Sequence, residues 1–396
     1  MPPARFPSID RRIAGACALT AIACAASYGG LFSHAYPGDT GVYEDYGRAL
    51  VENGRIPYRD FFDEYPPGSV PVFALPAILW NAHYLIVFKL WMTACAVGFT
   101  ACSGWVLQRL GLSLVRLLPI AVAPVLAGPV FLNRYDPFAA LVVSLALVAL
   151  LRGKDRSSAV LLGIGTAVKL YPAVVLPLLA RRVRSLRDAG IAFVVAAAVL
   201  VLPFFLLAPG GVGFSLWTQL RRHLQIESLG ASILLVGSNL GIHHVQWIDG
   251  KPGSIDLGGH LPDAVGFLAS VTSVALVLLV ARAYWKGADD DARLVTAWAA
   301  AIAGFTIFGK VLSPQYLTWL IPLVPLAAGR RGLLAAGTLV AALALSMPEY
   351  LFWGRHGLRN QDWTVWLLLA RNLLLVAVFW LLYSQLRQRE AIAKPS

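Results

Sequence analysis

The sequence contains little charge and little cysteine. Only 14% of its 396 residues are charged, whereas 58% are hydrophobic and the mean hydropathy is +0.67. A water-soluble globule of this length cannot bury so much apolar surface, so a soluble fold is excluded. The four cysteines, Cys17, Cys24, Cys95 and Cys102, all lie inside apolar runs, which favours packing over metal binding or disulfide formation.

Several motifs of soluble enzymes are also missing. No phosphate-binding GxxxxGK[ST] loop, GxGxxG turn before a helix, HExxH pair or GxSxG elbow stands where it would carry meaning. We also find no internal repeat of the kind that marks many transporters. No cofactor and no metal site is predicted.

Apolar runs are what the sequence has in abundance. They predict about twelve membrane crossings, and therefore an all-α polytopic membrane protein whose residues 1–396 form a single integral membrane domain. The runs 158–169 and 171–180 are too short for a straight spanning helix and indicate broken helices packed inside protein. The stretch 69–80 predicts a re-entrant or interfacial helix. The full set of predicted spans is 13–33, 84–107, 113–130, 137–151, 158–169, 171–180, 190–208, 263–282, 293–309, 314–328, 332–347 and 363–384.

The basic residues indicate an orientation. If the N-terminus is cytoplasmic, most of the 33 lysines and arginines fall on the inner side, and the outer side is close to neutral. The net charge of +12 then reflects topology, and no nucleic-acid partner is predicted. The predicted location is the plasma membrane, with both termini cytoplasmic, a tail at 385–396, and three extracytoplasmic loops at 34–70, 209–262 and 348–362.

The first of these loops holds the densest acidic and aromatic stretch. Asp39 follows the first span by about five residues, so it should lie at the membrane surface, where a carboxylate can act as a general base toward a hydroxyl. The alternative is that Asp39 only caps a helix. Glu64 and Tyr65 stand in the rigid turn DEYPPG, either to shape the loop or to contact substrate.

Three cations occur where apolar runs meet the outer side. They are Arg134 in NRYDP, Lys169 in VKLYP and Lys310 in GKVLSPQY. A cation there is costly unless it pairs or snorkels to the interface. Snorkelling is the plainer interpretation, and convergence on a bound anion such as a lipid phosphate is the sharper one.

Further polar residues on the outer side are candidates with open alternatives. Arg221, Arg222 and His223 can bind the same phosphate or grip anionic headgroups. Glu227 can orient an acceptor or bind an arginine. Tyr171, Gln315 and Tyr316 suit sugar contacts, although tyrosine is also a common interface anchor. The pair His243-His244 is better interpreted as loop surface than as a metal site.

Five segments in order resemble motifs of family 87 of the GT-C glycosyltransferases, over residues 36 to 330. The resemblance implies a GT-C-like helical bundle with long extracytoplasmic loops. It also implies a polyprenyl-phosphate-linked sugar donor, an acceptor outside the cell and an essential aspartate in the first outer loop. The segments are GDTGVYEDYGRALVENGRIPYRDFFDEYPPG, NRYDPFAALVVSLALVAL, GIGTAVKLYPAVVLPLLA, RHLQIESLGAS and KVLSPQYLTWLIP.

By its position after the first span, the essential aspartate corresponds to Asp39, with Asp45 as the competitor. Mannose is the first choice of donor sugar and arabinofuranose the second. The acceptor would be a hydroxyl of a cell-envelope glycolipid or polysaccharide. Because nucleotide sugars are absent outside the cytoplasmic membrane, an outer enzyme needs a lipid-borne donor.

The expected reaction is a single displacement that inverts the anomeric carbon. The leaving phosphate would be met by Lys169, Lys310, Arg134, His223 and Arg221. A polyprenyl-lipid transporter or flippase is the main alternative, and a structural scaffold the third. The long acidic outer loop favours the enzyme, since a transporter has less use for a surface carboxylate.

Overall fold

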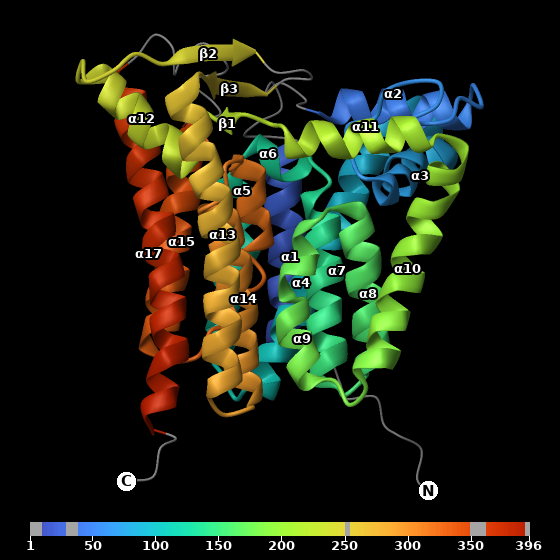
Figure 1. The fold of residues 1–396 in the computed structure, drawn as a ribbon. Helices are drawn as coiled ribbons and strands as arrows, with labels where there is room; N and C mark the ends of the chain where they lie inside the picture. The colour runs from blue at the N-terminus through green and yellow to red at the C-terminus, as the bar shows by residue number, and fades with distance from the viewer. Residues whose placement is uncertain (1–9, 29–38, 250–253, 349–361, 393–396) are drawn as a thin grey trace, which may run out of the picture.

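The computed structural model describes residues 10–28, 39–249, 254–348 and 362–392. Long helices run side by side, and one end of this bundle carries a layer of shorter elements (Figure 1). The helices of the bundle are α1 (Arg11–Ala26), α4 (Tyr84–Arg109), α5 (Leu118–Ala127), α7 (Asp136–Leu151), α8 (Asp155–Val168), α9 (Leu176–Arg182), α10 (Leu186–Leu207), α13 (His260–Lys286), α14 (Asp291–Ile307), α15 (Gly329–Pro348) and α17 (Asp362–Ile392).

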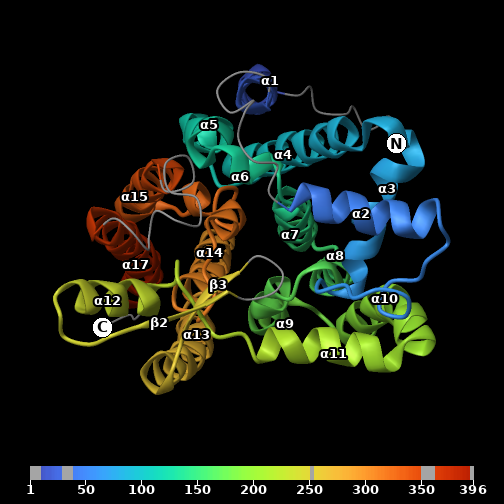
Figure 2. The same cartoon turned by 90° about the horizontal axis from the view of Figure 1, so that it is seen from above.

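The end layer is built mostly from the first two long loops of the sequence. It contains α2 (Thr40–Val51), α3 (Val70–Trp80), α6 (Pro129–Leu132), α11 (Pro209–Leu220) and α12 (Leu229–Asn239), together with three short strands. Of these elements, α3 comes directly after the first loop and α6 from the segment before α7. Seen from above, α2 and α11 lie in the plane of the view, whereas α7, α8 and α14 are seen nearly end-on (Figure 2). These two helices therefore cover the end of the bundle.

Several helices start where a polar side chain satisfies the first turn. The side chains of Asp10, Ser185, Ser228 and Asp290 each accept a backbone N–H of the helix that follows. Such caps replace hydrogen bonds that a helix cannot make within itself. Short 3₁₀ pieces lie between the helices, namely η2 (Pro67–Ser69), η3 (Asn81–His83), η4 (Leu114–Leu117), η5 (Tyr171–Val175), η6 (Pro314–Trp319) and η7 (Val324–Leu326). Proline helps to explain four of those in the described residues, whereas η3 and η4 contain no proline.

The core of the bundle centres on α14. Most of its side chains are buried, and Trp298 is fully buried among many alanines. Small residues let helix backbones approach closely, which suits packing inside a membrane. A second, smaller core lies in the end layer, where Leu224, Leu235 and Leu257 pack with Leu368 of α17.

The strands form a small antiparallel sheet. Its order is β1 (Leu224–Gln225), β3 (Ile255–Gly258), β2 (Gln246–Asp249), with Leu257 opposite both Leu224 and Trp247. The all-α prediction is therefore right for the bundle but missed this sheet. The strands are two to four residues long, too short to show an alternating pattern in sequence.

The apolar helices mark a membrane protein. Among the described residues, four helical stretches are long and apolar enough to cross a membrane: Pro67–Arg109, Leu186–Leu207, His260–Lys286 and Trp363–Gln388. The count of about twelve crossings stays a prediction. The segment 69–80, predicted as a re-entrant or interfacial helix, contains the last residue of η2 and all of α3. The helical stretch continues from it through η3 into α4.

The predicted loops are only partly within the described residues. The loop 34–70 is described from Asp39 and the loop 209–262 except for 250–253, and both contain helix. Nearly all of the third loop, 348–362, lies outside the described residues. The predicted tail 385–396 begins inside α17, which runs to Ile392.

Candidate functional site

Asp39 stands at the junction between the outer layer and the bundle. It directly precedes α2, yet its side chain makes no capping hydrogen bond to that helix. Its carboxylate instead forms an ion pair with the guanidinium of Arg134, and the Asp39 side chain remains one-third exposed. Thr40 donates to the backbone carbonyl of Asn133 at 3.1 Å, which fixes the start of α2 against the α6–α7 turn. The alternative that the Asp39 side chain only caps α2 therefore does not agree with the structure.

Tyr65 brings the DEYPPG turn to the same carboxylate. Its hydroxyl donates to Asp39 Oδ2 at 3.1 Å. The turn is held by Asp63, whose Oδ1 accepts the Tyr65 backbone N–H at 2.9 Å. It packs so tightly on α8 that a Cβ on Gly68 would lie 2.5 Å from the carbonyl carbon of Ala167. Only glycine allows this approach without displacing the turn.

Lys169 ends α8 inside a ring of aromatic side chains. Its Nζ donates to Asp136 Oδ1 at 2.7 Å, and Trp319 Nε1 donates to the same oxygen at 2.6 Å. The ammonium lies 4.4 Å from the ring centroid of Tyr135, 5.2 Å from that of Tyr316 and 5.3 Å from that of Trp319. A largely buried cation held this way is stabilised by a carboxylate and by ring faces together.

Aromatic packing joins the Asp39 group to the Lys169 group. Tyr135 lies between them, with its ring centroid 5.5 Å from that of Tyr65 and 5.6 Å from that of Tyr43. Tyr135 also stands between Arg134 and Asp136 in the chain. One short stretch, residues 134–136, therefore supplies the partner of each group.

The second long loop reaches this site where Arg222 and Gln219 lie near Glu64 of the first loop. Burial raises the pKa of Glu64, and the charges of Arg222 and Lys169 oppose that rise. Gln219 of α11 donates to the backbone carbonyl of Glu64 at 2.9 Å. Arg222 itself donates to Ser254 Oγ at 2.9 Å, which ties it to the sheet. The first and second loops thus meet beside Lys169.

The structure does not bring together all of the predicted phosphate-binding cations. Arg134 and Lys169 lie in this site. Lys310 donates instead to the backbone carbonyl of Leu220 at 2.7 Å, at the end of α11. Arg221 is exposed over the ring of Trp217, and the exposed His223 bonds Asp263 at 3.1 Å.

The predicted substrate contacts are also divided. Tyr316 faces Lys169, and the fully buried Tyr171 stacks on Trp319 with ring centroids 4.0 Å apart. Glu227 lies in the sheet region, where its backbone carbonyl accepts from Arg371 and Asn372. Gln315 accepts from Ser313 at 3.2 Å. Asp45 is exposed on α2.

Sequence reasoning missed four residues of the site: Asp136, Tyr135, Trp319 and Asp63. Of these four, Asp136 was the one that the sequence could most readily have revealed. A carboxylate next to Arg134 in an otherwise apolar region needs a partner. The roles of Trp319 and Tyr135 depend on contacts between segments far apart in sequence, which no local pattern reveals.

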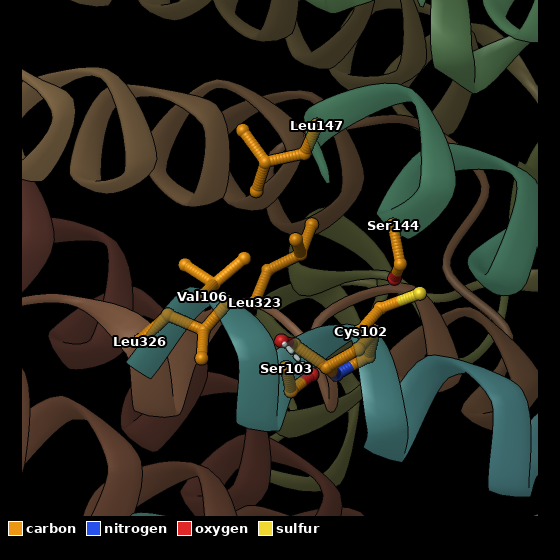
Figure 3. A pocket seen from close by; sticks show the side chains of 8 residues that line it. Cys102, Ser103, Val106, Ser144, Leu147, Leu323 and Leu326 are labelled. Atoms are coloured by element: carbon orange, nitrogen blue, oxygen red, sulfur yellow. Dashed lines mark hydrogen bonds between the residues drawn. The ribbon is translucent and has the colours of Figure 1, made fainter. Parts of the chain in front are cut away.

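A gap inside the bundle is not part of the site. It lies between α4, α7 and the segment after η6, and is lined by Cys102, Ser103, Ser144 and Leu147 among others (Figure 3). The Ser103 hydroxyl is 2.8 Å and 2.9 Å from the carbonyls of Phe99 and Pro322. The gap has no room for a water molecule, so it is a packing feature.

Chemically, the site combines a partly exposed carboxylate with fixed cations at the surface of an apolar bundle. A carboxylate of this kind can accept a proton from a hydroxyl, and the cations can stabilise a negative charge that develops beside it. These are the two needs of a transfer reaction with an anionic leaving group.

Comparison with known proteins gives the family. The family model of Glycosyltransferase family 87 matches residues 61–314, more than half of the chain. A crystal structure of ArnT from Cupriavidus metallidurans in the apo state is similar with a TM-score of 0.49 and 16% identity, covering 96% of this chain and 77% of that one. No curated protein matches. The family resemblance inferred from five sequence segments is confirmed: the chain belongs to glycosyltransferase family 87.

Proposed function

We propose that this membrane glycosyltransferase moves a sugar from a polyprenyl-phosphate donor to a hydroxyl of a cell-envelope glycolipid or polysaccharide, at the end of the bundle that carries the sheet. Mannose is the first choice of sugar and arabinofuranose the second. That end would face outward, with both termini cytoplasmic, because the opposite end carries most of the basic residues.

The observation that carries the proposal is the environment of Asp39. Its carboxylate is partly exposed, makes no helix cap and pairs with Arg134 beside Lys169, whose side chain is largely but not fully buried. A carboxylate that only stabilised α2 would bond the free N–H groups of its first turn. Asp39 is instead directed toward the end of the bundle where the two long loops meet.

In the proposed reaction, Asp39 accepts the proton of the acceptor hydroxyl as its oxygen attacks the anomeric carbon. The bond from that carbon to the phosphate oxygen breaks, and the phosphate leaves with the electron pair. Attack and departure on opposite faces invert the anomeric carbon. Arg134 exchanges Asp39 for the donor phosphate when the donor binds, which leaves the carboxylate free to act as a base.

Lys169 would stabilise the phosphate, because it lies in the same site as Arg134, whereas Lys310, Arg221 and His223 lie outside this site. Those three belong to the α11 and sheet region, where they suit the entry of a charged lipid headgroup. Tyr65 orients Asp39 through its hydroxyl, and Glu64 with Arg222 and Tyr316 would form the acceptor side. Glu227, Gln315 and Tyr171 would act by supporting these residues.

The test uses the purified full chain in lipid vesicles. Radiolabelled polyprenyl-phosphate-mannose and polyprenyl-phosphate-arabinofuranose are supplied in turn with a crude envelope glycan acceptor. Transfer from either donor by the wild-type protein, and its loss in Asp39→Asn, would support the proposal and identify the sugar. Movement of labelled lipid between leaflets without transfer would overturn it in favour of a flippase.

A further inference from the structure

A cavity of about 410 Å³ lies at the end of the bundle opposite the sheet. Its lining residues come from the end of α4, from the turn between α7 and α8, and from the turn between α9 and α10. Four arginines line it, namely Arg109, Arg152, Arg182 and Arg184, together with the single carboxylate of Asp155. None of these residues belongs to the site around Asp39.

Two of the four arginines already have acidic partners. Arg109 pairs with Asp291 at 2.8 Å, and Arg182 pairs with Asp289 at 2.8 Å as well as with Asp291. Their positive charge is therefore largely balanced within the protein. They fix one wall of the cavity rather than leave it charged.

The other two arginines give the cavity its excess charge. Arg152 lies over the ring of Trp105, 4.6 Å from its centroid, and Arg184 is exposed. Within the described residues, no carboxylate pairs with either guanidinium. The Asp155 carboxylate accepts the backbone N–H of Arg184 at 3.0 Å, so it holds the turn rather than the side chain.

The surroundings indicate what kind of anion reaches this cavity. Helix α10 begins at Leu186, two residues after Arg184. In its most apolar stretch of 18 residues, no residue is buried in the protein. One side of α10 packs on α8, and its other, apolar side is left to face lipid. The cavity at its first turn therefore lies level with lipid headgroups, where arginine is well suited to phosphate oxygens.

From this geometry we propose that the cavity binds the phosphate of an anionic lipid headgroup, held by Arg152 and Arg184. Binding there would anchor the α7–α8 and α9–α10 turns to the bilayer surface on the side away from the sugar-transfer site. This site is independent of the proposed reaction, because none of its residues touches Asp39, Arg134 or Lys169.

The test measures lipid binding to the full chain purified in detergent. Short-chain phosphatidylglycerol, short-chain phosphatidylcholine and inorganic phosphate are titrated separately, with retained lipid counted by native mass spectrometry and the melting temperature recorded. We expect phosphatidylglycerol to bind and to raise the melting temperature. The double variant Arg152→Gln/Arg184→Gln should bind it at least tenfold more weakly.

The matched control is Arg187→Gln/Arg282→Gln, which removes the same charge from exposed arginines at the same end of the bundle. It should bind phosphatidylglycerol as the wild type does. If both double variants lose binding equally, or if the cavity variant loses none, the proposed site is wrong. If inorganic phosphate binds as well as the lipid and depends on the same two arginines, the cavity takes free phosphate and the lipid source is excluded.

Discussion

The carboxylate of Asp39 is bonded to the guanidinium of Arg134 and to the hydroxyl of Tyr65, and not to the helix that Asp39 precedes. This arrangement links the two ends of the first loop to the turn between α6 and α7. It also holds the partly exposed carboxylate in a charge-balanced state. In the proposed reaction, the donor phosphate draws Arg134 away from it.

The roles of Asp39 and Arg134 can be separated kinetically. Removing a general base lowers turnover by about 10²–10⁴-fold, so Asp39→Asn should lower kcat while KM for the donor changes little. Arg134→Gln should instead raise KM for the donor, because it removes a phosphate contact. Steady-state kinetics with the active donor measure both.

Asp45→Asn is the comparison for Asp39→Asn, since both residues lie at or near the start of α2. Asp45 is exposed, so its amide variant should retain nearly full transfer. If Asp45→Asn loses turnover and Asp39→Asn does not, the base is Asp45 and the role proposed for Asp39 is wrong.

The pair of the buried Asp136 and the largely buried Lys169 should be sensitive to loss of one partner. Lys169→Met leaves the Asp136 carboxylate buried without its cation, and breaking such a pair costs about 3–5 kcal/mol. We expect a lower melting temperature for Lys169→Met. The double variant Lys169→Met/Asp136→Asn should recover much of the loss, because an amide needs no counter-charge.

The same double variant separates packing from donor binding. If Lys169 also meets the donor phosphate, the double variant is folded but transfers poorly. If it transfers at the wild-type rate, Lys169 serves only to support the fold. Thermal unfolding and the transfer assay, run on the same preparations, distinguish these results.

Asp63 predicts a pH dependence of stability. Burial is the main cause that raises its pKa to about 8, and Oδ2 has no hydrogen-bond partner among the described residues. Between the ordinary aspartate pKa and about pH 8, Asp63 is therefore protonated in the folded protein and ionised in the unfolded chain. The stability from this group is complete at low pH, below the ordinary aspartate pKa, and declines as the pH rises toward about 8.

Asp63→Asn should remove this dependence, because the amide stays neutral. Relative to the wild type, its melting temperature should be similar near pH 4 and increasingly higher toward pH 8. Melting temperatures measured across that range check the sign. A difference that does not change with pH would contradict the protonated buried carboxyl.

Two glycines of α11 should respond in opposite ways to alanine. A Cβ on Gly211 would lie 1.9 Å from the carbonyl oxygen of Tyr58, whereas a Cβ on Gly213 would meet nothing within 4 Å. Tyr58 already has a positive φ of 69° and has little freedom to yield. Gly211→Ala should therefore separate α11 from the first loop and lower the melting temperature.

Gly213→Ala should instead stabilise the helix by about 0.5–1 kcal/mol, since alanine is the better helix former. The two variants make the same chemical change two positions apart. If both destabilise equally, α11 does not pack on the Tyr58 loop as described.

The sequence by itself determined the membrane class, most of the places where apolar helices run, and the candidate base. The predicted span 314–328 is an exception, because the structure has the 3₁₀ pieces η6 and η7 there and no α-helix. Composition and hydrophobic runs suffice for the first two, because hydrocarbon requires long apolar helices whose hydrogen bonds are internal. Asp39 could be recognised from the sequence because an acidic, aromatic stretch directly after a first apolar run is unusual. Arg134 and Lys169 could also be recognised from the sequence, because a cation at the edge of an apolar run is unusual.

Only the tertiary structure decided which of these charges meet. It paired Arg134 with Asp39 and Lys169 with Asp136, placed Lys310, Arg221 and His223 in the α11 and sheet region, and formed a sheet from strands of two to four residues. Local patterns record periodicity and turn chemistry, whereas these contacts join distant segments. Their energy comes from charge pairing and aromatic packing in a buried setting, which exists only once the helices have assembled.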